Sequence, residues 1–354
     1  MSRPWRIAAQ GRVHPPSDHG TWTSEFDAAV DQWHRAIPWA STSGSTGTPV
    51  EHRFTMEAVQ ASAASTADHF GLDQARCKEV MAWSALPAAG TGGRMMVWRS
   101  LALGWDLTVT QPSLTPQVPV APSSSGRYHF AAATPLQAEH LMASDQLSRF
   151  AILLLGGAPL SPGLEAALQE AAGRSDCRIF HGFGMTETLT HIATRPLGTE
   201  AYTALPGVQI GTTETGALVL NVPQRGVHGL VTADAVKLHF DPLAAQDESA
   251  RQFSWLGRLD DVINSAGLKF HPAALEREWS SPLDRVVNGR KWYVTGRPDD
   301  SLGARVTLVV EGKPDPDLAS NILDTLNVAG NARPRSVEFR ATFQETASGK
   351  VRRT

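Results

Sequence analysis

The sequence predicts an α/β protein with a large N-terminal domain, residues 1–257, containing mixed and parallel sheets, and a small α+β C-terminal domain, residues 258–354. Three observations support this fold class. A chain of 354 residues is too long for one ordinary core. A short apolar run is followed directly by a helix start, which is typical of parallel sheets. A polar turn at Gly257–Asp261 precedes a compact unit of roughly a hundred residues.

The first of these elements is a buried strand followed by a helix. The apolar run Phe150–Leu155 ends at Gly156-Gly157, as expected for a strand inside a sheet. Ser161 is a suitable N-cap, and apolar residues recur at helical spacing through Leu160–Ala172. We expect strand, glycine turn and helix to alternate again around Arg178–Ile192.

The remaining elements follow from composition and spacing. Ser113–Gly126 is rich in turn residues and is expected to be a surface connection. In the C-terminal unit, Arg305–Val310 is predicted as a strand, Asp317–Asn327 as a helix and Ser336–Arg340 as another strand.

The composition makes several classes of function improbable. The chain has 32 Lys+Arg against 35 Asp+Glu, so it lacks the basic field that attracts nucleic acid or anionic lipid. Its apolar runs never reach the roughly 18 residues of a membrane span, so no stable membrane insertion is expected. Cys77 and Cys177 are the two cysteines, which favours a reducing compartment, and a cytoplasmic location is expected. Small molecules are the expected partners, and homo-oligomer formation stays open.

The most informative segment is Ser41–Pro49, in which serine, threonine and glycine dominate. Such residues leave backbone N–H groups and hydroxyls free to surround phosphate oxygens, and the glycines permit tight turns. The spacing differs from that of the P-loop, and a flexible loop is the alternative. The residues expected to contact phosphate are Ser41, Thr42, Ser43, Gly44, Ser45, Thr46 and Gly47.

Three later segments give this loop a context: Gly182–Thr188, Gly257–Gly267 and Thr346–Arg353. In this order, the four segments resemble the signature motifs of the adenylate-forming superfamily of acyl-CoA ligases, luciferases and peptide-synthetase adenylation domains. The resemblance covers residues 40–354. It implies that a carboxylate attacks ATP to give an acyl-adenylate and pyrophosphate, and that a thiol, here of coenzyme A, then displaces AMP. It also implies bound Mg²⁺ and a small C-terminal domain that rotates between the two steps.

The resemblance assigns roles to individual residues. Thr186 should contact phosphate, Glu187 should hold Mg²⁺, and Lys350 should contact the carboxylate and the α-phosphate during adenylation. A hard cation prefers carboxylate and water ligands, and a preorganised ammonium stabilises charge that develops in the transition state. The other implied contacts are Gly157, Ala158, Pro159 and Phe183 for adenine, Gly184 for ATP or AMP, Asp234 for the ribose hydroxyls and Arg258 for ribose or phosphate. The resemblance also makes Asp260 the hinge and places Ala266 and Gly267 in the loop of the CoA step.

The sequence departs from the superfamily pattern in two ways. Val50 and Glu51 follow the loop where a lysine is usual, so one charge directed at phosphate is missing. The loop also begins at residue 41, so part of the usual N-terminal lobe is expected to be absent.

The early position of the loop, after a short leading portion, resembles the arrangement in o-succinylbenzoate-CoA ligases of menaquinone biosynthesis. Local similarities lie in residues 86–87, 93–104, 185–193, 204–208 and 263–272, although Ala266 stands where glycine is usual. That acid has two carboxylates, and the one that does not react needs a cationic partner if it is buried. Arg94 is the predicted partner, with Gly157, Thr190 and His191 lining the pocket. The alternatives are a surface salt bridge for Arg94 and a structural role for His191.

Other functions stay open. The chain could activate another aryl or acyl acid or transfer it to a carrier-protein thiol. It could also be a catalytically silent nucleotide-binding relative, an alternative motivated by Val50 and opposed by the presence of Glu187 and Lys350. A serine hydrolase is disfavoured because no Gly-x-Ser-x-Gly motif is evident.

Overall fold

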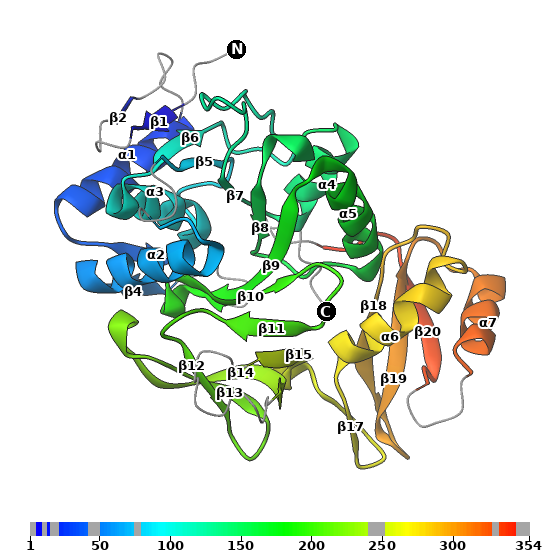
Figure 1. The fold of residues 1–354 in the computed structure, drawn as a ribbon. Coiled ribbons are helices and arrows are strands. Elements are labelled where there is room, and N and C mark those ends of the chain that lie inside the picture. The colour runs from blue at the N-terminus through cyan, green and yellow to red at the C-terminus, as the bar shows by residue number, and fades with distance from the viewer. Residues whose placement is uncertain are drawn as a thin grey trace.

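A computed structural model describes residues 5–8, 13–14, 21–41, 50–73, 79–239, 252–327 and 333–344. Within these ranges the chain forms a large mixed sheet, a small sheet with its own helices, and a two-stranded hairpin (Figure 1). This agrees with the predicted fold class. No helix in the described ranges is long and apolar enough to cross a membrane.

The large sheet has 13 strands among the described residues, in the order β12-β13-β14-β15-β11-β10-β9-β8-β7-β5-β6-β1-β2. Strands β6, β5, β7, β8 and β9 are parallel, and the other neighbours pair antiparallel. The strands are β1 (Trp5–Ile7), β2 (Val13–His14), β5 (Met81–Ser84), β6 (Asp106–Val109), β7 (Phe130–Ala133), β8 (Ile152–Leu155), β9 (Arg178–Met185), β10 (Thr190–Pro196), β11 (Ala201–Ala204), β12 (Gln209–Thr212), β13 (Ala217–Val222), β14 (Val227–His239) and β15 (Gln252–Arg258).

Helices cover both faces of the parallel strands. They are α1 (Thr21–His34), α2 (Met56–Phe70) and α3 (Thr91–Leu103) on one face, and α4 (Pro135–Ala143) and α5 (Pro162–Ser175) on the other. Alternate residues of β7 enter the two cores, Phe130 and Ala132 with α1–α3, and Ala131 and Ala133 with α4 and α5. A parallel strand buried on both faces must be apolar throughout, which explains why β8 is a continuous apolar run.

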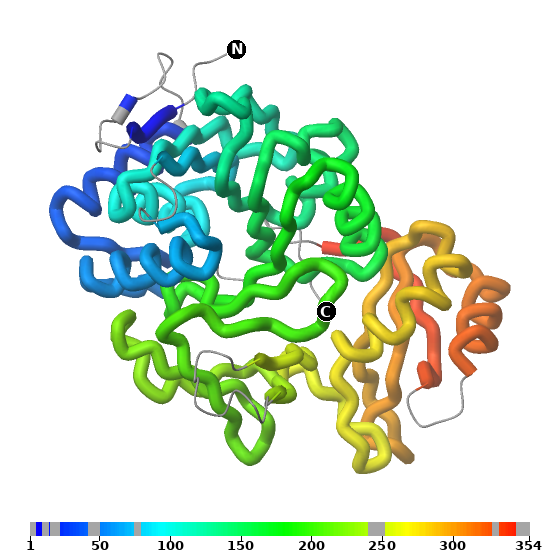
Figure 2. Tube along the Cα trace, in the orientation of Figure 1, coloured from blue at the N-terminus to red at the C-terminus, as the bar shows by residue number. Residues whose placement is uncertain are grey.

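The small sheet follows β15. It contains β16 (Ile263–Ser265), β17 (Leu268–Phe270), β18 (Trp292–Asp299), β19 (Gly303–Glu311) and β20 (Ser336–Arg340), with helices α6 (Pro272–Asp284) and α7 (Pro316–Thr325). These elements share a core that includes Leu275, Trp279 and Ile322. In Figure 2 the trace leaves the large sheet after β15 and enters this unit. β15 ends at the residue where the sequence predicts the domain boundary, and the division into two domains stays a prediction.

Most element predictions are confirmed. β8 lies within the predicted apolar run, and α5 begins after Ser161, whose side chain accepts a hydrogen bond from the Leu164 amide. β19, α7 and β20 occupy the predicted segments of the C-terminal unit.

The expected alternation after Arg178 is wrong. β9 is followed by the 3₁₀ turn Thr186–Thr188 and then by β10, which returns antiparallel. Leu189 and Thr190 both have positive φ, which reverses the chain within two residues. The apolar and glycine pattern therefore marked a tight reversal of a strand and not the start of a helix.

Gly184 makes this reversal possible. A Cβ atom at Gly184 would lie 2.0 Å from the Thr190 carbonyl oxygen and 2.5 Å from the His191 Cα. Both contacts are with backbone, which cannot move away as a flexible side chain would. The hairpin of β9 and β10 therefore requires glycine at this position.

We expect Gly184→Ala to lower the free energy of unfolding by about 3 kcal/mol, because the methyl group overpacks a backbone contact. The matched variant is Gly173→Ala in α5, where a Cβ meets no atom within 4 Å. It should raise stability by about 0.5–1 kcal/mol, since alanine is the better helix former. Chemical denaturation of both variants measures this, and equal stabilities would contradict the role of Gly184.

Candidate active site

The hairpin of β3 (Trp39–Ser41) and β4 (Glu51–Arg53) forms the base of the predicted phosphate loop. Ala40 pairs with His52, and Ser41 pairs with Glu51. Thr42, Ser43, Gly44, Ser45, Thr46 and Gly47 lie outside the described residues, as does Lys350. The structure therefore places the two ends of the loop, and the contacts of the loop itself stay a prediction.

Arg94 holds this hairpin through its contacts with Trp39 of β3. Its Nε donates to the Ala88 carbonyl over 3.0 Å, its Nη1 donates to the Trp39 carbonyl over 2.7 Å, and its guanidinium lies 4.5 Å from the centroid of the Trp39 ring. Arg94 is buried, so the alternative of a surface salt bridge is wrong. Since two of its nitrogens are engaged with backbone carbonyls, the geometry gives Arg94 a structural role and offers no support for carboxylate binding.

Thr186 lies where three segments meet. Its Oγ1 is 3.0 Å from the Oγ1 of Thr91, the first residue of α3. Thr91 Oγ1 also donates to the Ser41 carbonyl over 3.5 Å, and Ser41 and Gly90 form a parallel bridge. The start of the predicted phosphate loop, the N-terminus of α3 and the turn after β9 are therefore adjacent. Hydroxyls and a helix N-terminus together suit an anionic group.

Glu187 lies beside this convergence. Its Oε1 is 4.0 Å from Nε2 of His52, and its side chain is 38% exposed. The described residues contain no group of three or more His, Cys, Asp or Glu side chains placed to hold a metal ion. A single accessible carboxylate fits Mg²⁺, which commonly binds through one or two carboxylates, substrate phosphates and water.

His181 holds the segment Gly157–Pro159, which is predicted to lie along adenine and is called the adenine segment below. Its Nε2 lies 3.3 Å from the Ala158 carbonyl, and its Nδ1 lies 2.7 Å from the Tyr202 hydroxyl. Burial lowers the pKa of His181 to about 4, so the ring is neutral at pH 7. Because a carbonyl can only accept, Nε2 carries the proton and Nδ1 accepts from Tyr202. This bond holds the chain after Gly157, whose φ is +82°.

Phe183, the predicted adenine-stacking residue, is part of an aromatic cluster. Its ring contacts Tyr202 edge-on with a centroid distance of 5.7 Å and Phe253 edge-on at 5.2 Å. The Tyr202 and Phe253 rings stack on each other at 5.3 Å. Phe183 is half-buried against this core. Core packing thus fixes the orientation of the ring, and stacking on a base stays a prediction.

The predicted ribose residues lie on neighbouring strands. Asp234 on β14 pairs with Arg258 on β15. Asp234 Oδ1 accepts a hydrogen bond from Trp255 Nε1 over 2.8 Å, and Arg258 Nη2 donates to Asp260 Oδ2 over 2.6 Å. The sequence thus identified two residues that the structure brings together.

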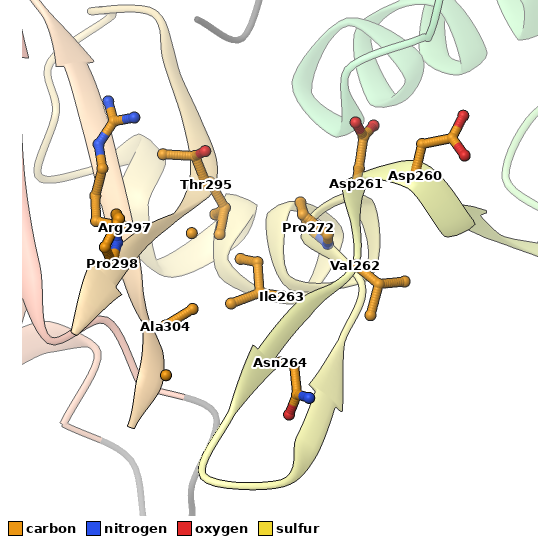
Figure 3. Close-up of a pocket in the computed structure, with 13 residues that line it drawn as sticks. Asp260, Asp261, Val262, Ile263, Asn264, Pro272, Thr295, Arg297, Pro298 and Ala304 are labelled. Atoms are coloured by element: carbon orange, nitrogen blue, oxygen red, sulfur yellow. The ribbon is translucent and has the colours of Figure 1, made fainter. Parts of the chain in front are cut away.

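Asp260, the predicted hinge, lies in the 3₁₀ turn Leu259–Asp261 between the two sheets. Figure 3 shows Asp260 and Asp261 at one side of a cavity of about 590 Å³, with Thr295 and Arg297 of the small sheet opposite. Asp260 thus borders an open space next to the small sheet. Rotation about it stays a prediction.

Ala266 and Gly267 form the two-residue turn between β16 and β17. Their φ values are +51° and +79°, as in a type I′ turn. The Ala266 amide donates to the Leu302 carbonyl over 2.8 Å. Alanine thus adopts the left-handed conformation that the more usual glycine adopts without cost.

Two buried arginines were not identified from the sequence. Arg99 on α3 is 2% exposed, its Nη1 reaches Met96 Sδ at 3.5 Å, and its Nε and Nη2 have no hydrogen-bond partner in the described part of the chain. Arg225 is 5% exposed, its Nη1 donates to the Thr188 and His191 carbonyls, and its Nη2 has no such partner among the same residues.

Both arginines remain cations at neutral pH. Burial and the nearby charge of Arg225 lower the pKa of Arg99 to about 9, and burial lowers the pKa of Arg225 to about 10. Among the described residues, neither arginine forms an ion pair with a carboxylate. The sequence signal that could have identified Arg99 is its position between the apolar runs Met95–Trp98 and Leu101–Leu103.

His191 borders this pair of cations. Its Nε2 is 3.3 Å from Thr66 Oγ1, and its Nδ1 is 3.4 Å from Thr190 Oγ1. Burial, together with the charges of Arg99 and Arg225, lowers the pKa of His191 well below its usual value. His191 is therefore neutral, and it has protein partners of the kind that the structural alternative expected.

An ion pair attaches α5 to the large sheet. Arg195 on β10 donates from Nη2 to Glu165 Oε2 over 2.7 Å and from Nη1 to Glu165 Oε1, and the Gly198 amide donates to Oε1 over 2.9 Å. The Arg195 guanidinium lies 5.5 Å from the centroid of the Tyr202 ring. Since α5 begins just after the predicted adenine segment, this pair helps to fix that segment relative to Tyr202 and His181.

The sequence matches the family described as AMP-binding enzyme over residues 34–229. It is 26% identical over 216 residues to a 2-succinylbenzoate–CoA ligase of Listeria monocytogenes, covering 57% of this chain and 44% of that protein. An acetyl-coenzyme A synthetase of Paraburkholderia phymatum is 26% identical over 250 residues, covering 59% and 37%. The chain thus spans less than half the length of these curated relatives.

A solved structure matches over nearly the whole of both chains. It is the crystal structure of an acyl-CoA synthetase (AMP-forming)/AMP-acid ligase II-like protein from Dyadobacter fermentans. The sequence identity is 26%, the TM-score is 0.61, and the match covers 99% of this chain and 97% of that chain.

We expect Glu165→Gln to lower the free energy of unfolding by about 3 kcal/mol at pH 7, because it leaves the largely buried Arg195 without its counter-charge. Burial alone would raise the pKa of Glu165, but the Arg195 and Gly198 hydrogen bonds and the Arg195 charge outweigh it and lower the pKa below 4.5.

This pKa shift sets the pH window. The stability difference between wild type and Glu165→Gln should be complete above pH 4.5 and should shrink as the pH falls through the lowered pKa, where the native carboxylate is protonated. Denaturation curves between pH 3 and 7 measure it. A difference that does not change with pH would mean that the charge of Glu165 contributes nothing.

Proposed function

Because this chain belongs to the AMP-binding enzyme family, we propose that it is an AMP-forming acid–CoA ligase whose acid is an aromatic dicarboxylate, o-succinylbenzoate in particular. The reaction would consume ATP, require Mg²⁺, and end with transfer of the acyl group to coenzyme A. For this acid, the chain would serve menaquinone biosynthesis. The proposal is supported by the convergence of Ser41, Thr91 and Thr186 beside Glu187, which suits a polyphosphate and its cation.

In the first step, a carboxylate oxygen of the acid attacks the α-phosphorus of ATP, and the bond to pyrophosphate breaks. The hydroxyls of Thr186 and Thr91 and the loop after Ser41 would bind phosphate oxygens, and Lys350 would contact the oxygens that gain charge. Glu187 would hold Mg²⁺, which neutralises charge on the leaving pyrophosphate.

The nucleoside would contact two groups of residues, one for the base and one for the ribose. Phe183 would stack on adenine, and the segment Gly157–Pro159 would lie along its edge, held by His181. Asp234, whose Oδ1 is held by Trp255, would bind ribose hydroxyls, with Arg258 beside it. Gly184 would keep the backbone close behind the base.

In the second step, the thiol of coenzyme A attacks the acyl carbonyl and AMP leaves. We propose that residues 258–354 form a domain that turns about Asp260 between the steps, removing Lys350 and presenting the Ala266-Gly267 turn. The position of Asp260 in a short turn between two separate sheets supports this hinge.

The observation that favours a dicarboxylate is the pair of buried cations Arg99 and Arg225. A buried charge without a counter-ion costs several kcal/mol, and the unpaired nitrogens of both side chains are donors that suit a carboxylate. We therefore propose that the second carboxylate of the acid binds here, with Arg99 in the role first predicted for Arg94. Thr190 and His191 would lie beside this carboxylate, because they lie next to the two arginines.

The similarity to an acetyl-coenzyme A synthetase makes acetate the second candidate for the acid. Acetate has no second carboxylate and would leave Arg99 and Arg225 uncompensated. The geometry therefore favours the larger, doubly charged acid. Transfer to a carrier-protein thiol is the alternative for the second step.

We expect pyrophosphate release that depends on acid, ATP and Mg²⁺, and that is fastest with o-succinylbenzoate in a panel including acetate, malonate and benzoate.

Lys350→Ala should slow this release of pyrophosphate by orders of magnitude while affecting thioester formation from supplied acyl-adenylate far less. A coupled pyrophosphate assay and a thioester assay measure the two steps separately. Release with none of these acids would refute the ligase, and equal loss in both steps would refute the role of Lys350.

We expect Arg99→Met to reduce kcat/KM for o-succinylbenzoate about 100-fold, which corresponds to about 3 kcal/mol, and to affect a monocarboxylate analogue little. The same variant should unfold at an equal or higher temperature, because methionine removes an uncompensated buried charge. Arg178→Ala, which removes an exposed arginine of β9, is the control and should change neither quantity. Equal losses for both acids, or a lower Tm, would make Arg99 a structural residue.

A further inference from the structure

His52 occupies a defined place at the base of the predicted phosphate loop. It lies on β4, directly across from Ala40 of β3, so its backbone position is set by the hairpin that closes the loop. Its neighbours on the strand, Glu51 and Arg53, pair with each other at 2.7 Å near the surface. The His52 side chain is only 25% exposed and lies toward Glu187 instead.

The Nε2 atom of His52 is a polar atom without a hydrogen-bond partner in the described part of the chain. This atom is also buried. Glu187 Oε1 is the nearby acceptor, and at 4.0 Å it is beyond hydrogen-bond distance. A buried polar atom without a hydrogen-bond partner is unfavourable. An acceptor on a ligand would supply that partner.

Few basic side chains near this hairpin are available to bind a phosphate. The predicted loop residues 42–49 contain no basic side chain, and Val50, which follows them, is apolar and 55% exposed. Arg94 is the nearest cation of α3 to this hairpin, and its Nε and Nη1 are engaged with backbone carbonyls. His52 is therefore the basic side chain of the hairpin that faces the Thr186–Glu187 turn.

We propose that His52 binds the pyrophosphate half of ATP, its Nε2–H donating to a β- or γ-phosphate oxygen. This rests on the proposed function, in which Phe183 and Gly157 bind the base. Phe183 precedes Thr186 along the chain on β9, and Glu187, which lies beside His52, follows it. A nucleotide whose α-phosphate binds at Thr186 would therefore present its outer phosphates toward His52. His52 supplies the donor that Val50 does not.

The experiment compares binding of ATP, AMP and pyrophosphate to the full chain by isothermal titration calorimetry, without acid. His52→Ala should weaken binding of MgATP and of magnesium pyrophosphate about 10-fold or more, the loss expected for a hydrogen bond to a charged group. AMP, which has no outer phosphates, should bind with unchanged Kd. His52→Gln, which keeps an N–H donor, should recover part of the affinity. Arg53→Ala on the same strand is the control and should leave all three ligands unaffected.

Each of the following results would contradict the proposal. If His52→Ala weakens AMP and ATP equally, His52 acts on the fold of the site and the proposal is wrong. If it weakens neither, the proposal is also wrong. If the loss for ATP disappears when the metal is removed with EDTA, His52 acts through the cation at Glu187 and does not contact phosphate. If the wild-type chain binds no nucleotide, the proposed function itself fails, and this inference fails with it.

Discussion

The close approach of Gly184 to the Thr190 carbonyl is the constraint on which the candidate site depends. It lets β9 and β10 pair through a reversal that contains two consecutive residues of positive φ, Leu189 and Thr190. That reversal brings the Thr186–Thr188 turn against the N-terminus of α3. It also changes the sheet from parallel to antiparallel, because β10 must return beside β9. The absence of a Cβ at Gly184 thus permits the close pairing of β9 and β10 that positions Thr186.

A polar seam between α2 and β10 is the second organising feature. Ser62 donates to the Leu189 carbonyl, Thr66 contacts His191, and His69 contacts Thr194, so the inner face of α2 satisfies polar groups that an apolar helix would leave unpaired. Arg99 and Arg225 lie next to this seam and are only partly satisfied. A buried charge without a counter-ion lowers the stability of the fold, and a ligand that supplies the counter-charge can restore that stability.

Positioning of the proposed nucleotide site is distributed over several side chains. His181 fixes the Ala158 carbonyl, Tyr202 fixes His181, and Arg195 lies over the Tyr202 ring while it pairs with Glu165. Each contact has one compatible arrangement of donors and acceptors, so the segment along the proposed adenine site is held without the ligand. Preorganisation of this kind reduces the entropy that binding must overcome.

The sequence by itself determined several of the elements and the order of the motifs. The β8 strand, the Ser161 cap and the C-terminal strands follow from local periodicity and capping chemistry, which need no distant partner. The tertiary structure alone decided which side chains share a site. Arg94 and Arg99 are five residues apart on one helix, yet the first binds backbone carbonyls and the second is buried with unpaired nitrogens. Spacing along a helix shows that the two face different directions, but what each one meets depends on strands that lie far away in the sequence.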